Sequence, residues 1–328
     1  MVVSIRLHNR ARKYMPHVQI MRGGVLMSLI GSFEVLLSDL LRLYYERHAS
    51  ALESDEKIHS FNEIRSFGSL NEFLSHVIEN KIDGFLRGSL VEWVKFFQRL
   101  RIDLTRFAPS WADFAECFQR RHVIVHNGGR VSRQYLERVD SSWLEKHKEE
   151  TKLGRFLEVS AEYLAKAFDS FELVGCLLSQ ECWKKFAHDD LKARGSTILE
   201  HQYECLVDAR WKIAEGLGSW VISEGEFNAL ETLIVRINRW LSIKRQGRWS
   251  EIEPEITSFD YSILEHRFVA AIYSLTGDAD SFFRILPKAA IPVDDLKAWP
   301  ILEDMRQDPR FGPFIEDLET SANMKTST

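Results

Sequence analysis

Residues 118–133 read FQRRHVIVHNGGRVSR, and this stretch decides both the fold class and the candidate site. Its apolar residues recur among arginines and histidines at the three- and four-residue spacing of a helix. Asn127, Gly128 and Gly129 then end the pattern, because these residues tolerate the left-handed backbone that a helix C-cap needs. The spacing therefore predicts a helix over 110–127 that ends beside two histidines.

The same helical spacing continues in both directions from this stretch. No proline occurs between Pro109 and Pro254, and clear two-residue alternation is absent. The sequence therefore predicts an all-α fold. Ser132 and Ser223 are the expected N-caps, and Glu226 completes a capping box with Ser223. We expect helices at 18–47, 70–80, 89–101, 110–127, 132–140, 152–189 (broken near 180), 196–217, 223–245, 260–276, 279–287 and 301–319.

A chain of 328 residues has room for about two domains. Gly195 interrupts the helical pattern after a charged stretch and marks the expected boundary. We expect a helical bundle over 1–193, a second helical region over 196–320 that could be solenoid-like, and a frayed polar tail over 321–328. Residues 265–292, EHRFVAAIYSLTGDADSFFRILPKAAIP, have the shape of one helix-turn-helix repeat.

The composition excludes several protein classes. Apolar residues make up 45% of the chain, which is typical of a globular protein and not of a disordered or collagen-like one. The net charge of −5 argues against a protein that coats nucleic acid, so any such contact must be local. The run 25–43 is the most membrane-like segment, but Glu34 and Asp39 within it favour a buried amphipathic helix. We expect a cytoplasmic protein without a membrane span.

Four scattered cysteines form neither a disulfide scaffold nor a zinc motif. We interpret them as reduced core thiols, which agrees with a cytoplasmic location. The sequence shows no carboxylate cluster that would hold a catalytic metal, and it lacks the common phosphate-loop and dinucleotide motifs. We therefore expect no metal and no other cofactor. The cysteines are Cys117, Cys176, Cys182 and Cys205.

The stretch 118–133 is locally cationic, since it carries four arginines and no acid in a chain of negative net charge. His122 and His126 lie four residues apart and share a helix face, while Arg121 lies on an adjacent face. Histidine moves protons near neutral pH, and arginine can hold two phosphate oxygens as charge builds on them. RNA supplies its own nucleophile, the 2′-hydroxyl. These residue types together favour metal-independent cleavage of RNA.

Arg121 to His126 read RHVIVH, which resembles the R-x4-6-H motif of the HEPN superfamily. His122 occupies the place after the arginine where that family commonly has a polar residue. Asn127-Gly128-Gly129 and the helix around 31–37 also resemble bacterial members. The resemblance covers residues 15–180 and implies a bundle of four or five helices that dimerises, so that two motifs share one cleft.

The resemblance also implies roles for the residues. Arg121 would hold phosphate, His126 would be the acid or base, and His122 and Asn127 would support them. Many relatives are ribonucleases of toxin–antitoxin or anti-phage systems, so RNA, a second copy and an antitoxin or regulatory protein are the expected partners. We expect the antitoxin or regulatory protein to bind 196–320. The alternative is that this region only enlarges the bundle. Three further arginines are candidate RNA-backbone contacts or solvated surface residues, namely Arg120, Arg130 and Arg133.

Other interpretations of the same residues remain open. His126 could be a capping or interface histidine, and His122 could serve as the second proton carrier within one chain. The two histidines could also bind a metal at i, i+4 spacing, although no nearby acid or cysteine completes such a site. Some HEPN members have lost nuclease activity, so the alternative function is a catalytically silent module that binds nucleotide, nucleic acid or protein.

Overall fold

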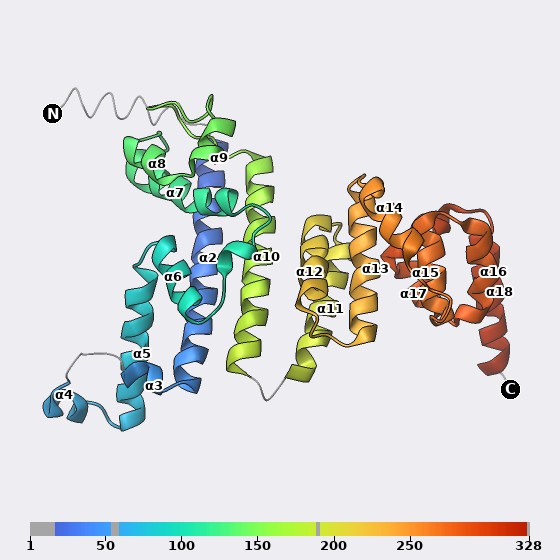
Figure 1. The fold of residues 1–328 in the computed structure, drawn as a ribbon, viewed down its shortest axis with the longest axis horizontal. Coiled ribbons are helices and arrows are strands. Elements are labelled where there is room, and N and C mark those ends of the chain that lie inside the picture. Colours follow the sequence, from blue (N-terminus) through green and yellow to red (C-terminus); the bar gives the residue numbers. More distant parts are fainter. Residues whose placement is uncertain (1–16, 54–58, 188–190, 327–328) are drawn as a thin grey trace. The chain divides into compact units, whose positions relative to one another are not determined.

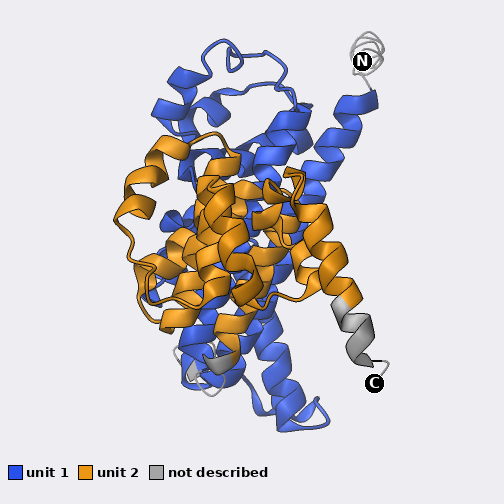
Figure 2. Cartoon of the chain, turned by 90° about the vertical axis from the view of Figure 1, so that its right-hand side faces the viewer, with its two compact units in different colours: residues 1–191 blue, residues 192–328 orange. Residues whose placement is uncertain are grey.

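The computed structural model describes residues 17–53, 59–187 and 191–326, and these form helices and short 3-10 turns (Figure 1). In this part of the chain the one β-type pairing is an isolated antiparallel bridge between Arg130 and Phe156. The prediction of an all-α fold is therefore confirmed. The chain divides into two compact units, 1–191 and 192–328, which are coloured separately in Figure 2.

Unit 1 is built around one long helix, α2. Its buried residues recur every three or four positions, so one stripe faces the core, and this stripe packs against α5, α7 and α10. Phe33 in the stripe lies edge-on to Phe114 and Phe171, with ring centroids 5.6 and 5.4 Å away. The helices of unit 1 are α2 (His17–Arg47), α3 (Ser50–Glu53), α4 (Phe61–Arg65), α5 (Leu70–Leu86), α6 (Leu90–Arg99), α7 (Trp111–Asn127), α8 (Arg133–Arg138), α9 (Ser141–Lys146) and α10 (Ala161–Phe186).

Unit 2 consists of successive helix pairs. α12 packs on α13 and α15 packs on α16. The predicted helix-turn-helix of 265–292 is α15 and α16, with Gly277 at φ 77° between them and Asp278 capping the second helix. The helices of unit 2 are α11 (Leu191–Val207), α12 (Trp211–Glu224), α13 (Ala229–Arg245), α14 (Trp249–Ser258), α15 (His266–Thr276), α16 (Ala279–Ala289), α17 (Val293–Ala298) and α18 (Phe311–Thr326).

Several expected helix boundaries are wrong. Gly195 does not break a helix but lies buried inside α11, where a Cβ would collide with the Glu231 carboxylate of α13. The break comes later, at Ala209, whose φ is 55°. Ser223 lies inside α12 and bonds back to the carbonyl of Trp220, so it caps nothing. The close approach of Glu231 to α11 favours a glycine at position 195, and a local sequence pattern does not reveal such a tertiary contact.

The two ends of the expected helical regions also differ from the structure. The helix expected from 152 begins only at Ala161 and continues unbroken to Phe186. α18 begins at Phe311 and continues to Thr326, so most of the tail expected to be frayed is helical, and 327–328 lie outside the described residues.

The helix α2 is long and apolar enough to cross a membrane by length and composition, and a third of its apolar window is buried in the fold. Buried core helices of soluble proteins and N-terminal signal sequences both have this length and composition.

Candidate functional site

The candidate site lies at the C-terminal end of α7, as predicted. The Ser110 hydroxyl accepts a hydrogen bond from the Asp113 N–H and begins the helix. The helix ends at Asn127, and Gly128 follows at φ 59° in the left-handed conformation. His126 therefore stands in the last turn, where the chain must leave the helix.

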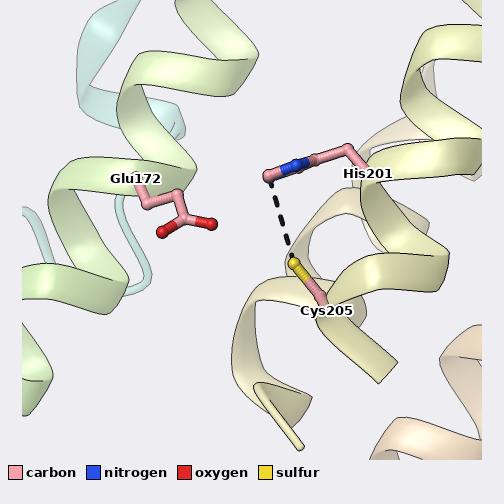
Figure 3. Close-up of side chains that lie close together, drawn as sticks. All are labelled: Glu172, His201 and Cys205. Carbon is pink, nitrogen blue, oxygen red and sulfur yellow. Dashed lines mark hydrogen bonds between the residues drawn. The ribbon is translucent and has the colours of Figure 1, made fainter. Parts of the chain in front are cut away.

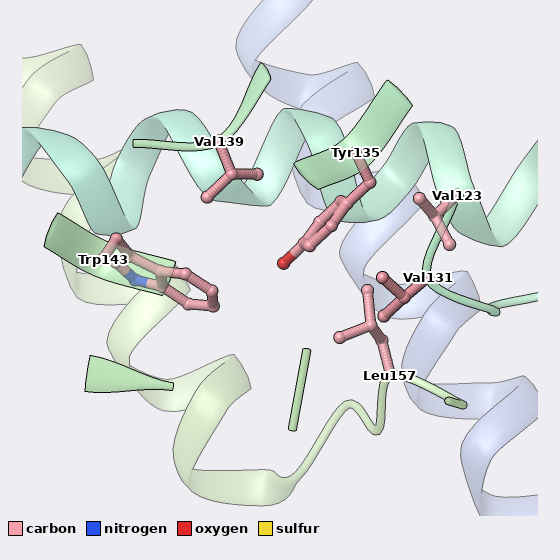
Figure 4. Close-up of a cluster of buried hydrophobic side chains, with 6 residues drawn as sticks. All are labelled: Val123, Val131, Tyr135, Val139, Trp143 and Leu157. Carbon is pink, nitrogen blue, oxygen red and sulfur yellow. The ribbon is translucent and has the colours of Figure 1, made fainter. Parts of the chain in front are cut away.

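The turn after α7 is held in place by several contacts. The Asn127 amide donates to the Arg130 carbonyl, so this side chain supports the turn itself. Gly129 has φ 78°, and a Cβ there would collide with the Phe156 ring. The Leu157 N–H donates to the Gly129 carbonyl at 2.8 Å. A buried apolar cluster lies beneath the turn and fixes the end of the helix (Figure 4), with side chains from Val123, Val131, Tyr135, Val139, Trp143 and Leu157.

The two histidines of the motif lie together at this end of α7. Their ring centroids are 4.6 Å apart and their planes are tilted by 47°. His122 is half-buried, and its Nε2 lies 3.3 Å from the Gln134 Oε1 of α8, while His126 is exposed. Gln134 therefore contacts one imidazole, and the other is exposed to solvent.

Arg121 is half-buried, and within the described part of the chain its guanidinium makes no hydrogen bond or ion pair. At 100° per residue, Arg121 and His126 project about 140° apart around the helix axis, whereas His122 and His126 are only about 40° apart. One chain therefore presents a pair of imidazoles on one side of α7 and an unpaired arginine toward another.

We predicted Arg120 to be a surface residue or an RNA contact, and this prediction is wrong, because the side chain is only 2% exposed. Its Nε donates to Glu116 at 2.8 Å, and its Nη1 donates to the Glu158 carbonyl at 2.5 Å. The same Glu116 carboxylate accepts hydrogen bonds from Tyr135 at 2.6 Å and Tyr163 at 2.7 Å. We call these four side chains the carboxylate cluster: Glu116, Arg120, Tyr135 and Tyr163.

Burial sets the protonation states within this cluster. Burial and the Glu116 charge raise the pKa of Tyr135 and Tyr163 far above the usual phenol range, so both hydroxyls remain donors. Burial opposes the charge on Arg120, but the adjacent carboxylate outweighs it and raises the guanidinium pKa. Burial also raises the pKa of the neighbouring Cys117 thiol to about 12, so this thiol is unreactive at neutral pH. The cluster is a fixed ionic support for α7.

The two remaining candidate arginines lie at the surface near the turn. Arg130 is exposed and its Nη1 donates to the Gly154 carbonyl at 3.2 Å, which ties the turn to the following loop. Arg133 is the exposed first residue of α8. Both remain candidates for contacts with an RNA backbone, and Arg130 also has a structural role.

Other histidines and cysteines do not extend this site. Among the described residues no acid or cysteine joins His122 and His126 in a three-ligand cluster. In unit 2, Cys205 Sγ lies 3.9 Å from His201 Nε2, one turn earlier on α11 (Figure 3), and His201 Nδ1 also lies 3.7 Å from Glu204.

Sequence reasoning missed four residues that shape the site. Glu116 precedes Arg120 by four positions, the spacing of an intrahelical ion pair, and this signal was present in the sequence. Gln134, Tyr135 and Tyr163 come from other elements, so no local pattern connects them with α7. A comparison with protein-family models, curated proteins and solved structures finds no match to this chain.

Proposed function

We propose that this protein is a metal-independent endoribonuclease that acts as a homodimer, with Arg121 and His126 as its catalytic residues. The observation that carries the proposal is the guanidinium of Arg121, which is half-buried and makes no hydrogen bond or ion pair with any other described residue. A charged fork without a partner suits an anionic ligand, and arginine matches the geometry of two phosphate oxygens. The two imidazoles at the same helix end supply proton carriers.

The proposed reaction needs a base and an acid. The base removes the proton of the ribose 2′-hydroxyl, whose oxygen attacks the adjacent phosphorus. The bond from phosphorus to the 5′-oxygen breaks, and the acid protonates that oxygen as it leaves. The products are a 2′,3′-cyclic phosphate and a free 5′-hydroxyl, and no water or metal is consumed. Arg121 would stabilise the charge on the non-bridging oxygens.

A second copy would complete the site. Across a two-fold axis, two copies of His126 provide one base and one acid. Within one chain, Arg121 projects about 140° away from His126 around α7, which disfavours a shared ligand. The same two-fold axis would bring Arg121 of one copy to the imidazoles of the other copy. His122 as the second proton carrier is the competing arrangement within a single copy.

Exposed apolar residues beside α7 support this dimer. Val18, Met21 and Val25 form a stripe on α2 at i, i+3 and i+7, with exposures of 47, 70 and 40%. On α7, Val125 is 49% exposed. The neighbouring Ile124 packs on Gly23 of α2, so α2 and α7 are in contact here. Exposed apolar patches commonly mark interfaces.

The resemblance of RHVIVH to the R-x4-6-H motif supports the same function and extends it to a toxin or anti-phage role in the cytoplasm. On this proposal RNA binds over the end of α7, where Arg130 and Arg133 are exposed. Unit 2 would then recruit an antitoxin or another regulatory protein. His201 and His266 are its histidines, and the chemistry would be confined to unit 1.

One observation favours a second candidate, a catalytically silent binding module. The Gln134 amide engages Nε2 of His122 at 3.3 Å, which leaves His126 as the one freely exposed imidazole of the motif. A chain that stays monomeric would then have a phosphate-binding arginine without a complete proton relay. Such a protein would bind RNA or nucleotide and leave it intact.

The test is incubation of the purified protein with end-labelled RNA in EDTA, beside the His126→Ala variant. The proposed function predicts cleavage with 2′,3′-cyclic phosphate ends by wild type and loss of cleavage in the variant. His266→Ala is the control, because this exposed histidine begins α15 in unit 2 and should leave cleavage unchanged. Binding without cleavage by wild type would establish the silent module instead.

A further inference from the structure

A cavity of about 300 Å³ opens in unit 2, among α11, α13, α15 and the segment 290–299. This volume is at the lower end of the range for ligand pockets, large enough for one bicyclic ring or one large side chain. Its lining is mainly aromatic and aliphatic, with contributions from Tyr203, Ile234, Ile237, Phe268, Pro292 and Trp299. Such a lining favours a flat apolar group.

Asn238, an amide side chain in the lining, is held in a fixed orientation by Gln202. Gln202 is completely buried, and its Nε2 donates to the backbone carbonyls of Ala214 at 2.9 Å and Val235 at 3.3 Å. Carbonyl oxygens only accept, so the Gln202 amide cannot be flipped, and its Oε1 must be an acceptor. Nδ2 of Asn238 donates to that oxygen at 3.1 Å, which fixes Asn238 as well.

This orientation leaves the Oδ1 atom of Asn238 available to the cavity. Asn238 lines the cavity and is only 3% exposed, and within the described residues no hydrogen bond engages its Oδ1. The Oδ1 atom is not among the fully buried unpartnered atoms, so it reaches the open space of the cavity, where a ligand N–H or O–H group can donate to it. The donor requirement comes from the fold and not from the resemblance that suggested RNA cleavage.

The charges of the lining balance. Arg267 and Asp295 are its one cation and one anion, and Arg267 is already paired with Glu265 at 2.9 Å. The guanidinium of Arg267 also lies 4.8 Å from the centre of the Phe268 ring. A site with balanced charge and an apolar lining discriminates against strongly charged ligands.

We propose that this cavity binds a neutral aromatic ring that carries an N–H donor, of which indole is the simplest case. The ring would lie among Tyr203, Phe268 and Trp299, and its N–H would donate to Oδ1 of Asn238. Two sources share this chemistry: a free indole-like compound and a tryptophan side chain of a partner protein. The site is separate from the α7 motif and does not depend on RNA cleavage.

The decisive test compares two isomers in calorimetric titrations of the full-length protein. 3-Methylindole and 1-methylindole have the same size and composition, but only the first retains the N–H. We expect 3-methylindole to bind about tenfold more tightly, the effect of one buried neutral hydrogen bond. Equal affinities, or no binding of either isomer at millimolar concentration, would overturn the proposal.

Variants locate the bound ring. Tyr203→Ala removes an exposed wall of the cavity and should weaken both isomers, whereas Asn238→Leu should remove the difference between them. If Asn238→Leu does not fold, the wild-type comparison and Tyr203→Ala still decide. Unchanged affinity in Tyr203→Ala would place the ligand elsewhere and contradict the proposal.

A third titration distinguishes the sources. An acetylated and amidated Gly-Gly-Trp-Gly-Gly peptide that binds more tightly than indole identifies the site as one for a protein partner. Tighter binding of free indole identifies it as a small-molecule site. Either result supports the proposed ring chemistry, and neither depends on whether the protein cleaves RNA.

Discussion

Each unit of this protein contains a buried polar cluster, and the two clusters differ in what they leave unused. In unit 1, both oxygens of Glu116 accept hydrogen bonds, from Arg120, Tyr135 and Tyr163. In unit 2, Asn238 donates to Gln202, but the side-chain oxygen of Asn238 accepts no hydrogen bond from the residues that the structure describes. A fully satisfied cluster stabilises the fold, whereas an unsatisfied acceptor in a cavity is suited to a ligand.

The same contrast separates two arginines that are adjacent in the sequence. Arg120 is buried and paired, and Arg121 is half-buried and unpaired within the described chain. They differ by 100° around α7, which turns one toward the core and the other away from it. Substituting each in turn therefore tests whether stability and activity are divided between them.

The largest effect should come from Arg120→Met. Removing one member of a buried ion pair leaves Glu116 charged without its partner, at a cost of about 3–5 kcal/mol in the free energy of unfolding. Urea denaturation measures this loss, and the matched Arg121→Met variant should change stability by less than about 0.5 kcal/mol. Equal losses in both variants would remove the contrast.

Thiol reactivity provides an independent readout of the same variant. Cys117 is 3% exposed and has a pKa of about 12, so iodoacetamide should not label it in the folded wild-type protein at pH 8. Arg120→Met should accelerate labelling of this cysteine because local opening becomes more frequent. Unchanged protection would show that the carboxylate cluster does not hold α7.

The next largest effect should be that of Arg121→Lys on RNA cleavage. An ammonium retains the charge but cannot hold two phosphate oxygens as a guanidinium does. The expected fall in kcat is about 10²–10³-fold, with the stability unchanged. Single-turnover cleavage in EDTA measures it, and near-normal rates would reduce Arg121 to a general electrostatic contribution.

A smaller effect, on dimerisation, should result from introducing a charged residue into the exposed apolar stripe of α2. Met21→Glu places a carboxylate in the proposed dimer interface and should raise the dimer dissociation constant about tenfold. Sedimentation velocity measures the constant, and activity should recover at higher protein concentration. Ile263→Glu, at an apolar residue 87% exposed in unit 2, is the control. An active wild-type monomer would contradict the dimer.

The fold was largely predictable because its signals are local. The spacing of apolar residues and the long gap without proline predict helices, and Asn127-Gly128 ends α7 where the chemistry of a left-handed cap requires. Gly195 does not interrupt a helix as predicted, because a glycine can serve close packing as well as a helix end. Its contact with Glu231 comes from 36 positions later in the chain, beyond the range of any local pattern.

The candidate site was only partly predictable. Spacing alone places His122 and His126 on one face, and the structure brings their rings within 4.6 Å. Arg120 was misassigned because an arginine without tertiary context is most often at the surface. The cavity of unit 2 could not be foreseen, since its lining comes from segments between Tyr203 and Trp299 that meet only in the folded chain.

The smallest effect should be a loss of stability in acid at the Lys244–Asp304 ion pair of unit 2. This pair is partly exposed, whereas the Glu116–Arg120 pair of unit 1 is buried. Asp304 accepts from Lys244 and contacts Arg245, each at 2.8 Å, and its side chain is 38% exposed. Partial burial opposes its charge, but the hydrogen bond and charge of Lys244, with the charge of Arg245, outweigh burial and lower the Asp304 pKa.

A lowered carboxyl pKa stabilises the folded state above the ordinary value of 3.8, and this contribution declines below 3.8 until it is lost at a pH below the lowered pKa. Asp304→Asn should therefore be slightly less stable than wild type at pH 7, by less than about 1 kcal/mol for a pair this exposed, and the difference should shrink as the pH falls from 3.8 toward 3. Hydrogen exchange in α13 at both pH values measures this change. A difference that persists undiminished at pH 3 would mean that Asp304 acts through packing and not through its charge.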